Sequence, residues 1–467
     1  MLLVAFAVAF FEQGAFYAQA QSHLGLFLVS AVLLQPAAVR IIKPDRPFVL
    51  LLALLAAWAL VDGALNHQPS RGLSYLFLLL GFVALYELGA SLSGLAGRLL
   101  EYGLVGLVAV VAGSGMVGVA LHNSWGFSSD QLWRASSVVT YPNALAALCA
   151  MFALLSLAEL CRTPDSVFFA VAAVILLAGL AETLSRAGLI GLAVGLTLLF
   201  VRSGVVVAFR SCRAPLMGST VAITSAYPSM LASEDLRTAL MAGGFVVGCF
   251  IGAGLPRFRV QLRIGVEVLV GLALVSAIAV GAGSALHRLT SSRATFHSPE
   301  RLHANLAAWE TLSAHPWFGA GPGLRGLDLS FAGGGIGRYR YAHNEYLQIL
   351  AELGLVGAVL LIAAVGCLVR RLQFRRYASA DSAREATASI SSADETSSVH
   401  VVSRVGVVAA LCALVVHAGF DFLLHFPVIP LLAAVLIGAI TPTVTDPEAT
   451  EFDNTRLLDF KEKEAAL

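Results

Sequence analysis

The chain has 467 residues, of which 58% are hydrophobic and only 13% are charged, and its formal net charge at pH 7 is +1. A soluble domain carries about twice that charged fraction, and a chain so close to neutral offers no basic surface for nucleic acid. Repeated apolar runs of about 17–25 residues favour membrane-spanning helices, because the bilayer core offers backbone polar groups no partner outside the segment. The short alternating segments of a membrane β-barrel are not found. The sequence therefore predicts an all-α, polytopic membrane protein.

The apolar runs predict about twelve to fourteen membrane spans, because two of them, 187–201 and 427–441, are short enough to be tilted, broken or re-entrant. In chain order the candidate spans are 2–18, 23–40, 47–63, 72–91, 99–121, 138–160, 166–182, 187–201, 214–231, 238–255, 264–283, 343–370, 404–424 and 427–441.

Basic residues are concentrated in one set of loops, among them the loops that hold Arg98, Arg162 and Arg210. Most basic residues of the opposite set lie in one long loop, 284–342, and long loops contribute little to orientation. The bias toward cytoplasmic Lys and Arg predicts that both termini are cytoplasmic and that this loop is extracytoplasmic.

The same patterns divide the chain. We expect a transmembrane bundle over 1–283, an extracytoplasmic catalytic loop over 284–342 and further transmembrane helices over 343–442. The stretch 372–403 is rich in Ser, Ala and charged residues and has almost nothing large and apolar, so it is predicted to be a disordered cytoplasmic linker. The polar residues 443–467 are predicted to be a cytoplasmic tail.

The long loop contains an amphipathic pattern, with Leu302, Leu306 and Trp309 at helical spacing and Ser298 positioned to cap the helix. A helix lying on the membrane surface fits this pattern. Arg301 opens it, and a guanidinium matches phosphate oxygens with two donors at once. An arginine that only extends to lipid headgroups is the alternative interpretation.

His343 stands where the long loop meets the next apolar run. An imidazole titrates near neutral pH and can accept the proton of an attacking hydroxyl. The alternative is a helix-start histidine that satisfies backbone groups together with Asn344. Further along the same run, Gly354 and Gly357 are predicted to allow close helix packing.

Three segments together resemble the O-antigen ligase and polymerase superfamily. The first is His343, Asn344, nine residues, Gly354, two residues and Gly357; the others are the run HPWFGAGPG from His315 and the run SRAG from Ser185. The resemblance implies a GT-C-like membrane enzyme that handles glycans linked to polyprenyl pyrophosphate on the outer face of the bacterial inner membrane.

The resemblance also implies roles for individual residues. His343 is expected to be catalytic, and Arg186 and Arg301 are expected to bind the donor pyrophosphate. For Arg186 an ion pair with Glu182, one helical turn earlier, is the alternative. Candidates for further substrate contacts are Arg338, Arg340, Asn143, Asn344 and Tyr346.

Asp421 and His425 flank the last outer turn at i and i+4 spacing, and a structural Asp–His pair is the favoured interpretation. No Asp-x-Asp pair and no Gly-Lys-Ser/Thr phosphate loop occurs in the sequence. We therefore predict no metal ion and no cofactor.

The expected activity is an inverting, metal-independent transfer of a glycan from undecaprenyl pyrophosphate to an acceptor hydroxyl, with a lipid A core sugar favoured as in O-antigen ligases. A polymerase and a protein O-oligosaccharyltransferase of the same superfamily remain open. A transporter or flippase of lipid-linked glycans is the alternative from another class. The expected partners are the lipid-linked donor, the acceptor and membrane lipids, and no nucleic acid is expected.

Overall fold

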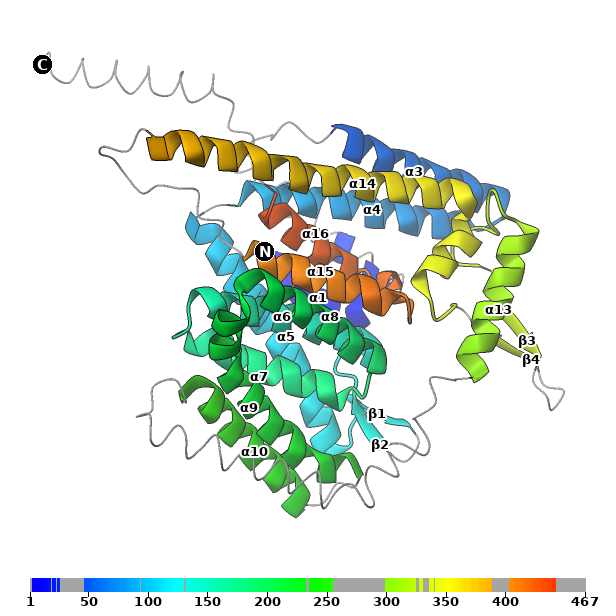
Figure 1. The fold of residues 1–467 in the computed structure, drawn as a ribbon. Coiled ribbons are helices and arrows are strands. Elements are labelled where there is room, and N and C mark those ends of the chain that lie inside the picture. Colours follow the sequence, from blue (N-terminus) through cyan, green and yellow to red (C-terminus); the bar gives the residue numbers. More distant parts are fainter. Residues whose placement is uncertain are drawn as a thin grey trace, which may run out of the picture.

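The computed structural model describes residues 2–17, 19–21, 23–25, 46–92, 94–129, 132–231, 235–254, 299–324, 327–330, 336–339, 341–388 and 403–441. Helices dominate these residues, and two small β-hairpins are added to them (Figure 1). The elements are α1 Leu2–Phe11, η1 Gln13–Ala15, α3 Arg46–Leu65, α4 Pro69–Ser91, α5 Gly94–Leu121, β1 Gly126–Ser129, β2 Leu132–Ala135, α6 Pro142–Arg162, α7 Val167–Glu182, α8 Arg186–Ser203, α9 Val205–Leu231, α10 Asp235–Gly254, α13 Pro299–Ala314, β3 Leu327–Ser330, β4 Ile336–Tyr339, α14 Glu345–Ala388, α15 Arg404–Ala418, η3 Leu423–His425 and α16 Val428–Ala439.

The prediction of an all-α polytopic membrane protein is confirmed. Among the described residues, seven helices are long and apolar enough to cross a bilayer: α3, α4, α5, α6, α8, α10 and the first part of α14, to Arg370. Four shorter helices, α1, α7, α15 and α16, are also apolar. The predicted span 264–283 and residues 26–40 of the predicted span 23–40 lie outside the described residues.

Helix α6 lies at the centre of the bundle, between α3, α4 and α14 on one side and α9 and α10 on the other (Figure 1). Its whole length from Pro142 to Leu160 is buried, against α7, α8 and α15. Small residues make this burial feasible, because neighbouring backbones can approach closely where side chains are short. At Gly195 of α8, for example, an added Cβ would lie 2.2 Å from a methyl of Leu154. The first turn of α6 is therefore held in a fixed position.

Helix α14 is broken at Gly354, whose φ of 64° and ψ of −168° are not helical. The run from His315 fills the break, and Gly319 lies so close that an added Cβ would be 2.2 Å from the Glu352 carbonyl oxygen. Gly354 was expected to serve helix packing, but it serves this break instead: its positive φ suits glycine, and a Cβ there would lie 2.4 Å from the Trp317 oxygen. Backbone hydrogen bonds join the two segments: Ala320 N to Ala351 O, Gly321 N to Glu352 O, Leu355 N to Pro316 O and Val356 N to Trp317 O.

The second half of α14 runs to Ala388, within the stretch 372–403 that is predicted to be a disordered cytoplasmic linker, and the linker stays a prediction. A helix already formed in the bilayer extends at low cost, because only its nucleation is expensive, and Ala, Arg and Glu are good helix formers. Residues 389–402 lie outside the described part of the chain.

Helix α13 forms where the amphipathic pattern predicted a helix, but it packs through its small residues. Ala304 and Ala308 are buried against the start of α14, whereas Leu302, Leu306 and Trp309 are exposed. The apolar face is thus available to a membrane surface rather than to the protein core. Figure 1 shows that α13, the start of α14 and both hairpins lie at the same end of the bundle.

Candidate functional site

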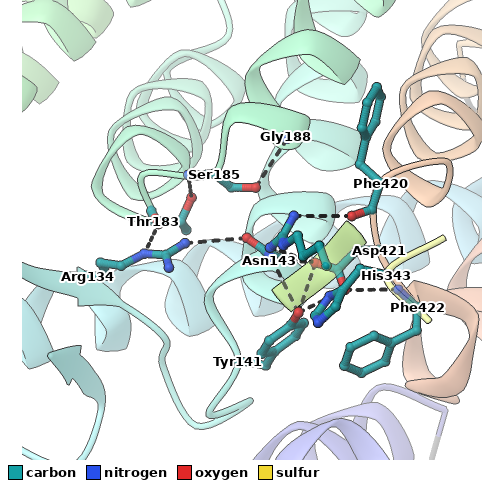
Figure 2. Close-up of polar contacts among 11 residues, drawn as sticks. Arg134, Tyr141, Asn143, Thr183, Ser185, Gly188, His343, Phe420, Asp421 and Phe422 are labelled. Atoms are coloured by element: carbon teal, nitrogen blue, oxygen red, sulfur yellow. Dashed lines mark hydrogen bonds and ion pairs between the residues drawn. The ribbon is translucent and has the colours of Figure 1, made fainter. Parts of the chain in front are cut away.

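Asp421 is the centre of a polar cluster at this end of the bundle. It lies in the turn after α15, and its side chain is fully buried. A buried carboxylate is costly unless it is hydrogen-bonded and paired with positive charge. The residues that meet this need come from segments far apart in the sequence (Figure 2).

The head of α6 supplies two of the partners. The hydroxyl of Tyr141 donates to both carboxylate oxygens of Asp421 at 2.8 Å. Asn143 donates through Nδ2 to Oδ2 of the same carboxylate. Pro142 occupies the first position of α6, where its missing N–H costs nothing. The Tyr-Pro-Asn sequence thus starts the helix and directs two donors at Asp421.

Two predicted site residues complete the cluster. Nδ1 of His343 lies 3.2 Å from Oδ1 of Asp421, and Nη2 of Arg301 lies 3.8 Å from Oδ2. Arg301 also donates to the carbonyl oxygen of Phe420 at 3.3 Å. Arg301, His343 and Asn143, which the sequence singled out separately, are therefore brought together around a single carboxylate.

The charge state of Asp421 follows from these contacts. Burial alone would raise its pKa, but the hydrogen bond from His343 and the charges of His343 and Arg301 outweigh burial and lower the pKa below its usual value of 3.8. Burial and the nearby carboxylate have the opposite effect on the phenol, and they raise the pKa of Tyr141 well above 10.0. Near neutral pH, Asp421 is ionised and Tyr141 is a hydrogen-bond donor.

An ionised carboxylate only accepts hydrogen bonds, so His343 must present Nδ1–H to Asp421. In the neutral imidazole this leaves Nε2 with its lone pair. The His343 side chain is 17% exposed. The arrangement can accept a proton at Nε2 and stabilise the imidazolium that forms, as carboxylate–histidine pairs do in other enzymes.

The predicted pair between Asp421 and His425 is not formed. Nδ1 of His425 lies 3.0 Å from Glu345, and Nε2 lies 3.3 Å from Glu352. Burial alone would lower the pKa of His425, but these two carboxylates raise it well above its usual value. The i and i+4 spacing pairs side chains only on an α-helix, and the chain here forms the 3-10 helix η3, which ends at His425. His425 ties this turn to α14, and Leu424 N also donates to Glu345, at 2.9 Å.

Arg186 is exposed at the first position of α8, directly after the capping residue Ser185. Its predicted alternative partner, Glu182, is buried, and the carboxylate of Glu182 has no hydrogen-bond partner in the part of the chain that is described. The turn that precedes Arg186 is connected to the cluster: Arg134 donates to Thr183 O at 2.7 Å and to Asn143 Oδ1 at 3.4 Å.

The other candidates occupy different positions. Asn344 caps α14, since its Oδ1 accepts from Leu347 N at 3.1 Å, and Tyr346 donates to Val415 O at 2.5 Å. Arg338 lies on β4, but its side chain is outside the described part of the structure, as is the whole of Arg340.

Sequence reasoning missed Tyr141, Arg134 and the central role of Asp421. Tyr141 and Asp421 are 280 positions apart in the chain, so no local pattern connects them. A usable signal was present in each case: a polar residue at the predicted outer end of a long apolar run, where an unpaired charge is expensive. Within the residues described, no group of three or more His, Cys, Asp or Glu side chains is arranged to hold a metal ion.

Residues 229–362 match the family model described as O-Antigen ligase. The comparison with curated proteins found no match. The matched segment contains Arg301, His343 and the broken part of α14, whereas Arg134, Asn143, Arg186 and Asp421 lie outside it. The match supports a function of the O-antigen ligase or polymerase type in a multi-pass membrane protein. Residues 229–362 are therefore similar to the O-antigen ligase family, and this similarity supports a place for the chain in the O-antigen ligase and polymerase superfamily.

Proposed function

We propose that the chain is a membrane glycosyltransferase that moves a glycan from undecaprenyl pyrophosphate to an acceptor hydroxyl. The observation that carries this proposal is the pair formed by His343 and Asp421 at 3.2 Å, with Arg301 beside the same carboxylate. A base and a cation next to each other meet the two needs of such a transfer: a proton leaves the acceptor, and negative charge develops on the leaving group.

In this mechanism His343 is the general base. The hydroxyl oxygen of the acceptor attacks the anomeric carbon, the bond from that carbon to the pyrophosphate oxygen breaks, and Nε2 of His343 takes the hydroxyl proton. Asp421 holds the ring and stabilises the imidazolium. A single displacement inverts the anomeric configuration.

Arg301 and Arg186 bind the departing pyrophosphate. A guanidinium is charged at any relevant pH and offers two parallel donors to phosphate oxygens. Because fixed positive charge meets the developing negative charge, the leaving group needs no acid and the reaction is proposed to be independent of metal ions.

The favoured acceptor is a lipid A core sugar, which would make the enzyme an O-antigen ligase. The end of another lipid-linked glycan would make it a polymerase, and a Ser or Thr side chain would make it a protein O-oligosaccharyltransferase. We place the protein in the bacterial inner membrane with its site on the extracytoplasmic face, because the Lys and Arg bias supports that orientation.

Arg301 provides the test of donor binding. In liposomes that hold the purified protein and a polyprenyl-pyrophosphate glycan, Arg301→Ala should weaken donor binding about 10- to 100-fold, as expected for lost bonds to a charged group. Arg301→Lys should recover only part of this loss, because a point charge lacks the fork of donors. Arg237, which donates to the carbonyl of Pro228 and does not belong to the cluster, provides a control as Arg237→Gln. Normal donor affinity in Arg301→Ala would refute the assignment, and activity lost in EDTA and restored by magnesium would refute metal independence.

The orientation has its own test. In a cysteine-free background, Ser313→Cys on the exposed end of α13 should react with a membrane-impermeant maleimide in intact spheroplasts. Asp165→Cys, in the exposed turn between α6 and α7, should react only after permeabilisation. The reverse pattern would place the candidate site on the cytoplasmic face.

A further inference from the structure

Arg134 is the least expected residue in the polar cluster around Asp421. It lies on β2 of the first hairpin, far outside the segment that matches the O-antigen ligase model. It nevertheless links two parts of the candidate site, because its guanidinium contacts Thr183, just before Arg186, and Asn143, which binds Asp421 (Figure 2).

The hairpin that carries Arg134 is firmly held. Trp133 stacks on His122 with ring centroids 4.4 Å apart. The backbone at the start of the hairpin packs closely against α5: a Cβ added to Gly118 of α5 would lie 2.2 Å from the backbone carbonyl carbon of Trp125. Ser137 N also donates to Trp125 O at 2.8 Å. A hairpin fixed in this way presents its arginine without a large loss of conformational freedom when a ligand binds.

The hydrogen bonds from Arg134 to Thr183 and to Asn143 differ in length. The bond from Nε to Thr183 O is short at 2.7 Å, whereas the contact from Nη2 to Asn143 Oδ1 is 3.4 Å, at the long limit for a hydrogen bond. The first bond anchors the guanidinium. The second is weak, so a phosphate oxygen can replace Asn143 at little cost and gain a charge-assisted bond.

The charges of the site also favour a third cation. A pyrophosphate that links a lipid to a glycan carries about two negative charges, one on each esterified phosphate. Arg186 and Arg301 supply two positive charges, but Asp421 is ionised, so these three groups leave only one in excess. With Arg134 included the excess is two, which balances the donor.

We infer that Arg134 is a third pyrophosphate-binding residue, which acts with Arg186 on the phosphate groups of the lipid-linked donor. The inference rests on the proposed function, since it assigns a further contact in the same reaction. The alternative is an arginine that only holds the turn at Thr183 in place.

The experiment compares two lipids with the full chain in detergent: undecaprenyl pyrophosphate without glycan, and undecaprenyl monophosphate. The wild type should bind the pyrophosphate more tightly. Arg134→Gln should weaken pyrophosphate binding about 10- to 100-fold and monophosphate binding much less, so that the preference is lost. Arg134→Lys should retain part of the preference, and the control Arg237→Gln should retain all of it.

Other binding results would overturn either the role of Arg134 or the proposed function. An equal loss of affinity for both lipids in Arg134→Gln would show a structural role and overturn the inference. Unchanged binding in Arg134→Gln, with loss in Arg301→Gln, would overturn it and leave the proposed function standing. A wild type that does not prefer the pyrophosphate would count against the proposed function itself. If Arg134→Gln does not fold, Arg134→Lys decides, because a fully retained preference there would mean that the guanidinium is not a phosphate ligand.

Discussion

Replacement of His343 by alanine is expected to slow glycan transfer by about 10²–10⁴-fold while donor binding is retained. The acceptor hydroxyl must lose its proton as the bond to carbon forms, and His343 is proposed to accept it. The ring can be removed without unfolding the site, because Asp421 keeps its bonds to Tyr141 and Asn143. Single-turnover rates, measured beside the donor dissociation constant, give the two quantities separately.

A matched control is His303→Ala, since His303 is an exposed histidine on α13 in the same outer region. It should leave both quantities unchanged. If His343→Ala lost donor affinity in proportion to its rate, His343 would be a phosphate-positioning residue rather than the base. A product with retained anomeric configuration would exclude the single displacement.

The helices themselves were largely predictable, because each depends on a local quantity. An apolar run long enough to span a bilayer must satisfy its backbone within the segment, and α5 and α6 appear where such runs occur. The break in α14 was not predictable in the same way. Gly354 in an apolar run fits close helix packing equally well, and only the approach of the loop at Trp317 shows that a positive φ is needed.

The face that α13 buries could not be inferred from hydrophobicity either. Its leucines and alanines both recur at helical spacing, and in a soluble protein the larger residues would be buried. Near a bilayer this preference weakens, because lipid is as apolar as a protein core and close packing favours small residues. Ala304 and Ala308 are therefore inside, and Leu306 is outside.

The residues of the candidate site also differ in whether a local sequence pattern or long-range packing reveals them. Arg301 and His343 were identified because they lie in a segment with a recognisable pattern. Asp421 was noticed, but it was paired with its sequence neighbour His425, and its real partners, Tyr141 and Asn143, are separated from it by 280 and 278 positions. Long-range pairing is set by helix packing, which a single sequence does not specify.

The substitution Asp421→Asn is expected to have the other large effect: a loss of transfer rate of about 10²–10⁴-fold in a protein that still folds. The amide has the shape of the carboxylate but can offer an N–H to Nδ1 of His343. The ring would then hold its proton on Nε2, the wrong tautomer for a base. Donor affinity should change less than in Arg301→Ala, because the arginines remain.

The pH dependence of stability provides an independent check. The folded-state pKa of Asp421 is lowered, so its ionised form stabilises the fold at neutral pH, and this contribution is lost as the pH falls from 3.8 through the lower folded-state pKa. The difference in thermal stability between wild type and Asp421→Asn should therefore be largest near pH 7 and shrink under strong acid. Asp62→Asn, at another buried aspartate, controls for the loss of a buried carboxylate, and it should alter stability with little effect on turnover.

A near-normal transfer rate in Asp421→Asn, together with an inactive His343→Ala, would mean that His343 works without its carboxylate partner. The cluster around Asp421 would then be a structural support for Arg301 and His343 rather than part of the chemistry.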